Sequence, residues 1–458
     1  MYFNDTVCAV ATPAGTGGVA IVRISGSKAK FIAEKICGIA IEKPRHAYYC
    51  KNVASLDDVL LTYFKAPNSY TGEDVVEISC HASTYITSRL LELCVDSGAR
   101  IARAGEFTER AFLNGRMDLA QAEAVADLIA SENAASHHLA LQQLRGGLSN
   151  FLAYLREQLL HLASLLELEL DFSEEDLEFA NREELALLLE KIKEQAVSLC
   201  NSFILGNAIK EGVPVAIIGK PNAGKSTLLN ALLHEEKALV SDIPGTTRDA
   251  IEDTIVIEGV KFRFIDTAGL RTATDEVERM GVERTYEKMQ NASIWLYMFD
   301  VTSLSLEQAL EEVTELKRIS KSQNVKVFLV GNKCDLLGAA PTGGVASDVV
   351  EGIASDVIFI SAKNADILEL KKKLFEACGI NNISQQQVIL SNARHYEILQ
   401  RIVRQTDEAL NAISAGLPSD LLAQHIRVAI SSVSEITGGE ILPDNILANI
   451  FSKFCIGK

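Results

Sequence analysis

A glycine-rich stretch in the middle of the chain has the residue types and spacing that bind phosphate. Residues 219–227 read GKPNAGKST and fit the pattern G-x-x-x-x-G-K-S/T. The apolar run VPVAIIG precedes it and KSTLLNALL follows it, which predicts a buried strand, a loop and a helix. Loop amides would then face the phosphates, with Lys225 on the outer phosphates and Ser226 on a magnesium ion. A chance glycine turn is the alternative.

Three further apolar runs end in residues that suit a guanine nucleotide. VKVFLVGNKCD ends in Asn332, Lys333 and Asp335, and a carboxylate there can accept hydrogen bonds from both N–H groups of the guanine edge. VIFISAK ends in residues able to close over the same base, and FRFIDTAG places an acidic residue near magnesium and a glycine near the γ-phosphate. Their order and spacing match the GTPase fold and make a chance turn untenable, so GTP is the predicted ligand.

The predicted GTP-binding residues are Asn222, Ala223, Gly224, Lys225, Ser226, Thr227, Ser241, Asp242, Ile243, Pro244, Gly245, Thr246, Thr247, Asp266, Thr267, Ala268, Gly269, Asn332, Lys333, Asp335, Ser361, Ala362 and Lys363.

One position bears on how GTP is hydrolysed. Ras-like GTPases carry a water-orienting glutamine just after D-T-A-G, whereas this chain has Leu270, which neither donates to nor accepts from water. Asn222 can offer an oxygen to a monovalent cation, and the stretch SDIPGTTRD (241–249) offers further oxygens and Thr247 as a second magnesium ligand. Carboxylates after Gly269 can align a water. The alternatives are that Asn222 caps a turn and that Glu276 and Glu278 only solvate a helix start.

Composition bounds the class of protein. The 458 residues predict about three domains. Nine cysteines without a C-x-x-C pair suit a reducing compartment, and neither a signal peptide nor an apolar span is visible, so a soluble, cytoplasmic protein is expected. The net charge of −17 leaves no segment with the basic footprint of an autonomous nucleic-acid binder. An RNA substrate would need a partner or a local patch to supply phosphate contacts.

The pattern along the chain predicts four segments. Residues 1–118 mix β-branched runs with turn signals and one helical pattern, which is typical of an α+β domain; residues 119–211 are long amphipathic helices. Residues 212–379 alternate strands and helices and form the predicted G domain, after which helices return in 380–458. Because helices with one apolar stripe must bury it, the two helical segments are expected to pack together, with the G domain inserted between them.

Stretches outside the G domain identify a family. ATPAGTGGVAIVRISG, PNSYTGEDVVEISCHAS, RAGEFTERAFLNGRMDLAQAEAVADLI and the terminal FCIGK resemble those of the MnmE (TrmE) family of tRNA-modification GTPases, over essentially the whole chain. The resemblance implies three parts: an α+β N-terminal domain like tetrahydrofolate-binding folds, an all-α central domain, and an inserted Ras-like α/β P-loop G domain.

The resemblance also implies an activity with partners. The family forms a homodimer through its N-terminal domains and works with the flavoprotein MnmG, in a heterotetramer or larger complex that brings FAD only through the partner. Together they add aminomethyl or carboxymethylaminomethyl groups to carbon 5 of the wobble uridine of certain tRNAs. The carbon comes from a tetrahydrofolate derivative, with the 5,10-methylene or 5-formyl form expected at the site, and glycine or ammonium supplies the nitrogen. Potassium activates GTP hydrolysis and lets the two G domains meet.

Family roles fall on particular positions of this sequence. Potassium ligands would be Asn222, Ser241, Ile243 and Thr246; magnesium ligands would be Ser226 and Thr247; Glu278 would orient the attacking water through a bridging water, so that Glu278, Asn222 and Thr247 form the expected catalytic set. Folate contacts would be Arg23, Glu77, Arg116 and Lys458, which without the family are ordinary surface charges. Cys455 is either a reactive thiol or inert.

Some positions depart from the family pattern, and two other functions remain open. Thr16 stands where arginine is frequent, Ala82 and Ser83 replace two glycines, and Arg116 replaces a common lysine, which bears on folate binding and not on the GTPase. One alternative is a GTP-controlled ribosome-assembly factor, although such factors usually append a basic RNA-binding module. The other is a folate-dependent aminomethyltransferase that GTP merely regulates.

Overall fold

A computed structural model describes residues 5–171, 182–237, 252–265, 292–320, 325–336, 356–378, 388–439 and 444–452, with Phe454 and Gly457. The chain divides into two compact units: residues 1–130, 140–196 and 398–458 form the first, and residues 131–139 and 197–397 form the second. The short segment 131–139 therefore groups with the predicted G domain, which the sequence pattern did not indicate. The finer boundaries at 118, 211 and 379 stay predictions.

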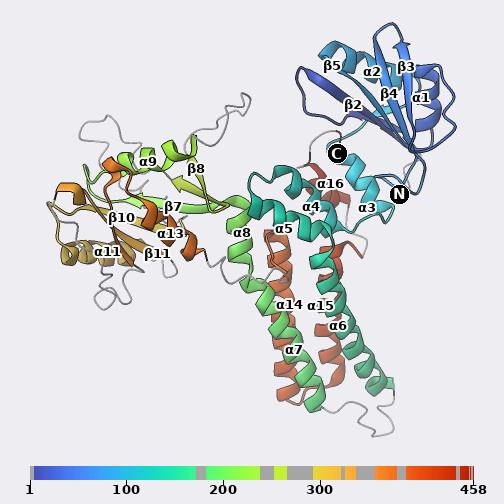
Figure 1. Cartoon of the computed structure of the whole chain (residues 1–458). Helices are drawn as coiled ribbons and strands as arrows, with labels where there is room; N and C mark the ends of the chain where they lie inside the picture. The colour runs from blue at the N-terminus through green and yellow to red at the C-terminus, as the bar shows by residue number, and fades with distance from the viewer. Residues whose placement is uncertain are drawn as a thin grey trace, which may run out of the picture. The chain divides into compact units, whose positions relative to one another are not determined.

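The first unit opens with a six-stranded mixed sheet in the order β3-β4-β5-β2-β1-β6, drawn in blue in Figure 1. Its strands are β1 (Val7–Val10), β2 (Gly17–Ser25), β3 (Ala47–Val53), β4 (Asp57–Phe64), β5 (Val75–Ala82) and β6 (Arg100–Ile101). Burial alternates along β4, because successive side chains point to opposite faces of the sheet. Helices α1 (Ala29–Cys37) and α2 (Thr84–Asp96) share the core on one face.

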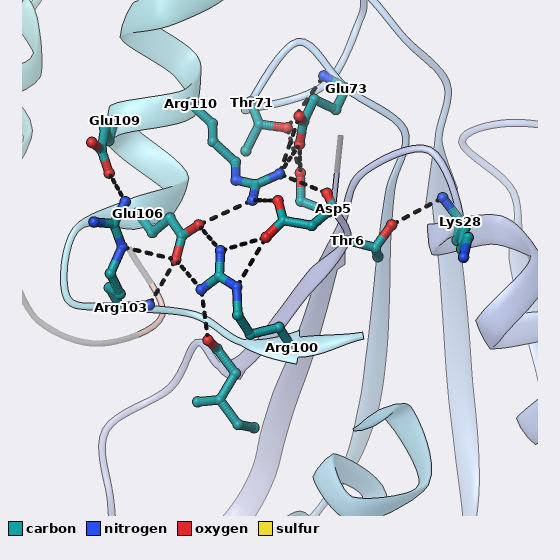
Figure 2. Close-up of polar contacts among 12 residues, drawn as sticks. Asp5, Thr6, Lys28, Thr71, Glu73, Arg100, Arg103, Glu106, Glu109 and Arg110 are labelled. Carbon is teal, nitrogen blue, oxygen red and sulfur yellow. Dashed lines mark hydrogen bonds and ion pairs between the residues drawn. The ribbon is translucent and has the colours of Figure 1, made fainter. Parts of the chain in front are cut away.

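A buried ionic cluster lies against α3 (Glu106–Leu113), and Figure 2 shows the polar contacts among its side chains. The Arg110 side chain is fully buried and donates to Asp5 Oδ1 at 2.6 Å, to Glu106 Oε1 at 3.0 Å and to both Glu73 oxygens at 3.2 Å. Arg100, on β6, donates hydrogen bonds to both Asp5 and Glu106. Because buried charges are tolerated only when paired, this cluster fixes the 70–74 loop, the chain start and α3 relative to one another.

Long helices make up the rest of the first unit. They are α4 (Leu119–Ala130), α5 (Ala134–Leu144, from Ala140 onward), α6 (Gly147–Asp171), α7 (Arg182–Asn201, to Ala196), α14 (Ala393–Ser414, from Ile398), α15 (Ser419–Thr437) and α16 (Asp444–Ser452). Buried leucines recur along α6 at 152, 155, 159, 162 and 166, and α15 buries Leu422, Ile426, Ala429, Val433 and Ile436 at the same spacing. The two helices pack against each other, which confirms the expected pairing of the segments before and after the G domain.

The second unit is built on a six-stranded sheet in the order β12-β11-β10-β7-β9-β8, in which only β8 runs antiparallel to its neighbour. The strands are β7 (Val213–Ile218), β8 (Glu252–Ile257), β9 (Val260–Ile265), β10 (Ile294–Asp300), β11 (Lys326–Asn332) and β12 (Asp356–Phe359). Helices α8 (Phe203–Glu211), α9 (Lys225–Lys237), α11 (Leu306–Ser320) and α13 (Leu368–Ala377) accompany them, with short 3-10 turns at Cys334–Leu336 and Ala362–Asn364. None of the described helices is long and apolar enough to cross a membrane.

The ionic cluster predicts a specific loss of stability in acid. Burial alone raises the pKa of Glu106, but hydrogen bonds from Arg100, the Arg103 backbone N–H and Arg110 outweigh it and lower the pKa from 4.5 to about 2. Because the folded-state pKa is the lower one, the stabilisation is complete above pH 4.5 and disappears as the pH falls towards 2. It amounts to about 3 kcal/mol.

Calorimetry of wild type and Glu106→Gln between pH 7 and pH 3 checks this. We expect the variant to unfold at a lower temperature at pH 7 and the gap to shrink steadily in acid. A gap that stays constant down to pH 3 would show that Glu106 stabilises the fold through packing and not through its charge.

Candidate functional site

The phosphate loop connects β7 to α9, as the sequence predicted. Gly219 and Gly224 have φ angles of 145° and 100°, and a Cβ added to them would lie 2.1 Å from Met298 O and from Asn332 Nδ2 respectively. Both positions therefore require glycine, for conformation and for space. Lys225, the first residue of α9, donates from Nζ to the carbonyls of Gly219 at 2.6 Å and Lys220 at 2.8 Å, so its ammonium lies across the loop. The backbone can thus approach a phosphate chain closely at a helix N-terminus.

Asn332 joins the phosphate loop to the base side of the site. Its side chain is 3% exposed; Nδ2 donates to Ala223 O at 2.8 Å and Oδ1 accepts from the Ala362 N–H at 3.0 Å. Asp335 lies on the following turn, where Ser361 Oγ donates to its Oδ1 at 2.8 Å. The structure therefore brings Ala223, Asn332, Asp335, Ser361 and Ala362 together, as a guanine site requires.

Lys333 and Lys363 differ in how they are held. Lys333 has a left-handed backbone (φ 69°), and its ammonium lies 2.6 Å from Asp300 Oδ2. Partial burial of Asp300 opposes its ionisation, but hydrogen bonds from Lys333 and Thr302 outweigh that effect and lower the pKa of the carboxyl group. Lys363 is exposed. Of the remaining loop positions, Asn222 also adopts a left-handed conformation (φ 63°) and is exposed, while Ser226 and Thr227 lie in the first turn of α9.

Several predicted site residues lie outside the described residues. They are Ser241, Asp242, Ile243, Pro244, Gly245, Thr246, Thr247, Asp266, Thr267, Ala268, Gly269, Leu270, Glu276, Glu278, Cys455 and Lys458. Their roles stay predictions.

A second cluster of candidate residues lies on the N-terminal sheet. Arg23 on β2 and Glu77 on β5 are register partners, and Arg23 Nε and Nη2 each lie 2.9 Å from Glu77 Oε1. The Arg23 guanidinium carbon also lies 5.3 Å from the Tyr70 ring centroid and 5.5 Å from that of Phe107, and Nη1 donates to Gly457 O at 3.3 Å. Arg23 is therefore held by a carboxylate, two aromatic rings and the end of the chain.

Arg116 is not part of this contact set. It is exposed, and its Cγ would lie 3.2 Å from a Cβ added to Gly72 in the 70–74 loop; no described contact joins it to Arg23 or Glu77. Of the positions that depart from the family pattern, Ala82 ends β5 opposite Gly17, and Ser83 precedes α2 without making a side-chain cap. The 70–74 loop thus approaches Arg116 at Gly72 and Arg23 at Tyr70.

Sequence patterns did not indicate Asp300, Tyr70 or Phe107. Asp300 had a usable signal, because it is the first polar residue after the buried run IWLYMF and so ends a parallel strand at the same edge as the other motifs. Tyr70 and Phe107 had none, since they approach Arg23 only through folding.

The parallel sheet, the glycine-bounded phosphate loop and the guanine-edge residues define a P-loop GTPase. Comparison with known families then narrows the class. The family "GTP-binding protein TrmE N-terminus" matches residues 6–116, and the "MnmE helical domain" family matches residues 119–455. The chain therefore belongs to the MnmE family, and it is a GTP hydrolase. The predicted fold class, an α+β N-terminal domain with an all-α domain and an inserted G domain, is confirmed.

Individual relatives agree over full length. A tRNA modification GTPase MnmE from Cytophaga hutchinsonii is 52% identical, covering 99% of this chain and 98% of the relative; one from Flavobacterium psychrophilum is 45% identical over all of both chains. A solved structure of Era with MgGDPNP and a 16S ribosomal RNA fragment is 25% identical over 42% of this chain and 66% of its own, with a TM-score of 0.28. The family assignment rests on the full-length relatives and not on that structural likeness.

Gly224→Ala is expected to abolish tight GTP binding. The added methyl meets Asn332 Nδ2 at 2.1 Å, so either the loop or the Asn332 bridge must move. We expect binding of a fluorescent GTP analogue to weaken by roughly 100-fold or more, since losing a buried hydrogen-bond bridge adds to backbone strain of about 1–2 kcal/mol.

Gly416→Ala is the matched control, because Gly416 has a φ of 63° but open space around it. It carries the backbone strain alone and should bind the analogue as wild type does. Tight binding by the Gly224 variant would mean that the loop tolerates a side chain at this contact.

Proposed function

We propose that this protein is a potassium-activated GTPase that, with the flavoprotein MnmG, installs aminomethyl or carboxymethylaminomethyl groups at carbon 5 of the wobble uridine of certain tRNAs. The observation that carries the proposal is the match to both the N-terminal and the helical family over residues 6–116 and 119–455. A GTP-controlled ribosome-assembly factor would share the G domain only. An aminomethyltransferase merely regulated by GTP would need neither MnmG nor hydrolysis coupled to the reaction.

The phosphate side of the site fits a GTP–magnesium complex. The close approach at Gly224 leaves a backbone-lined cradle, and Lys225 supplies a positive charge across it. Ser226, in the first turn of α9, and Thr247 would hold the magnesium ion, which when bound offsets charge on the phosphates. Asp335, oriented by Ser361, would accept from the guanine N–H groups.

The cation proposal rests on Asn222 and on Leu270. Asn222 is exposed at the tip of the phosphate loop, and among the described residues its side chain forms no hydrogen bond of the kind that caps a turn. Its oxygen would join Ser241, Ile243 and Thr246 as a potassium ligand. A bound potassium ion supplies positive charge beside the phosphates, as an arginine finger does in other GTPases. Because Leu270 cannot orient water, Glu278 would do so through a bridging water, with Thr247 alongside.

The one-carbon proposal rests on the Arg23–Glu77 cluster. Only Oε1 of Glu77 contacts Arg23 in the described structure, so Oε2 is available to accept from the N–H donors of a pterin ring. Arg116 and Lys458 would contribute positive charge towards the folate carboxylates. A tetrahydrofolate derivative, in the 5,10-methylene or 5-formyl form, would supply the transferred carbon, and FAD would come only with MnmG.

The assembly that this chemistry needs is a homodimer bound to MnmG and to tRNA. The chain has 61 acidic against 44 basic residues, so its average surface repels nucleic acid. A partner that supplies much of the contact to the tRNA backbone is consistent with that balance.

Potassium should stimulate GTP turnover strongly. We expect turnover in potassium chloride to exceed that in sodium chloride at matched ionic strength by roughly 100-fold or more, because an arginine finger, which supplies positive charge to the phosphates in other GTPases, contributes about 10³–10⁵. Asn222→Ala should lose this stimulation, and Glu278→Ala should turn over slowly in both salts, while both still bind GTP.

Equal, slow rates in the two salts would contradict the cation site and would instead favour activation by a partner protein. Glu315→Gln, which breaks an exposed ion pair with Arg318 on α11 and not at the phosphates, should remain potassium-stimulated and serves as the control.

Folate binding should depend on Glu77. Calorimetric titration with 5-formyltetrahydrofolate is expected to show at least about 10-fold weaker binding by Glu77→Gln, because a hydrogen bond to a charged group contributes about 1.5–3 kcal/mol. Glu92→Gln alters an exposed ion pair with Arg89 on α2 and should bind as wild type does. Equal affinity of all three proteins would remove Glu77 from the folate site.

A further inference from the structure

Strand β10 carries none of the nucleotide motifs, yet it lies between two of the strands that do. Residues Ile294–Tyr297 pair with β7, which leads into the phosphate loop, and Ile294–Asp300 pair with β11, which leads into the base motif. The carboxyl ends of these parallel strands meet at one edge of the sheet. Asp300, the last residue of β10, stands directly opposite Asn332. It is therefore one strand away from the guanine-binding residues.

The Asp300 carboxylate is fully engaged by neighbours at this edge. Thr302 donates to Oδ1 from its backbone N–H at 2.9 Å and from Oγ1 at 2.6 Å, which fixes the carboxylate on the turn after β10. The other oxygen, Oδ2, accepts from Lys333 Nζ at 2.6 Å. The backbone closes the same connection, since the Val301 N–H donates to Asn332 O at 3.2 Å. Asp300 is thus a rigid acceptor aimed at a single ammonium group.

Lys333 needs such a partner more than an ordinary surface lysine does. It lies between Asn332 and the turn that carries Asp335, and its backbone has a left-handed conformation that a residue with a Cβ rarely adopts. A lysine side chain loses about 1.5–2 kcal/mol of rotamer freedom when it is ordered. If Asp300 already orders the Lys333 side chain in the free protein, nucleotide binding does not incur this loss of rotamer freedom.

We propose that Asp300 is a further residue of the nucleotide site: it positions Lys333 for the guanine base without contacting the nucleotide itself. The Asp300–Lys333 pair is well suited to this role because the two side chains are only 17% and 33% exposed. Ion pairs of that kind are screened less than surface pairs.

A second ion pair from the same strand–helix unit provides a comparison. Glu312 on α11 contacts Lys220 of the phosphate loop at 2.5 Å and accepts a hydrogen bond from Tyr297 of β10. Here Lys220 is 61% exposed, so the pair is expected to contribute little. Because the Asp300–Lys333 pair is less exposed than the Glu312–Lys220 pair, we expect the effect on binding at the base and not at the phosphates.

The test is the dissociation rate of a fluorescent GDP analogue from the full-length protein. We expect Asp300→Asn to release it about three- to tenfold faster, which is the cost of ordering one long side chain at binding. The loss in GTP turnover should appear as a raised KM and not as a lowered kcat. Asp300→Glu keeps a carboxylate and should release the analogue more slowly than Asp300→Asn does. Glu315→Gln, which breaks an exposed pair with Arg318 on α11, should behave as wild type.

A double-mutant cycle with Lys333→Met separates positioning from general stability. If Asp300 acts through Lys333, then Asp300→Asn adds little to the release rate once Lys333 is methionine. Wild-type release from Asp300→Asn overturns the proposal, and so does an undiminished effect in the Lys333→Met background. If Asp300→Asn does not fold, Thr302→Val, which loosens the same carboxylate, takes its place in the cycle with the same expected and contrary outcomes.

Discussion

The nucleotide site depends on one buried amide. Asn332 donates a hydrogen bond to Ala223 O in the phosphate loop and accepts one from the Ala362 N–H in the base loop, the 361–363 segment after β12. The residue is 3% exposed. Because an amide presents its donor and acceptor at a fixed angle, satisfying both bonds sets the distance between the two loops. Leaving a buried donor or acceptor unpaired costs about 1–3 kcal/mol, so the loops cannot separate without penalty. The same amide explains why residue 224 has no side chain.

The sheet beneath that amide is a rigid support. Along β10, Ile294, Leu296 and Met298 belong to the core on one face, while Trp295, Tyr297 and Phe299 belong to the core on the other. A strand buried on both faces cannot shift its register by one residue without moving both of these sets into cores shaped for the other. The carboxyl end of β10 therefore holds Asp300 in a fixed position. A strand without any nucleotide motif can in this way contribute to the site, because its position is over-determined by packing.

In the N-terminal part of the chain, the candidate site is positioned by a buried ionic cluster, whereas in the G domain apolar packing of β10 positions Asp300. The fully buried Arg110 forms ion pairs with Asp5, Glu73 and the equally buried Glu106, so the 70–74 loop is attached to α3 and to the chain start. That loop in turn places Tyr70 beside Arg23, whose guanidinium holds Glu77. A buried ion network contributes little net stability compared with apolar packing, but removing one partner costs about 3–5 kcal/mol. It thus enforces one geometry of the candidate folate site.

The phosphate loop, the guanine-edge residues, the helical pairing and the family could all be predicted from the sequence, because each depends on local spacing or on one-dimensional periodicity. The motif GKPNAGKST specifies the backbone conformation of the phosphate loop, and NKCD specifies side chains that can hydrogen-bond to the guanine edge. The leucines of α6 repeat with the helix period. Three other features emerge only from the folded chain: Asp300 holds Lys333, two aromatic rings and Gly457 contact Arg23, and residues 131–139 group with the G-domain unit. Those contacts join residues far apart in the chain, and a single sequence contains no spacing that encodes which distant charges and rings will meet.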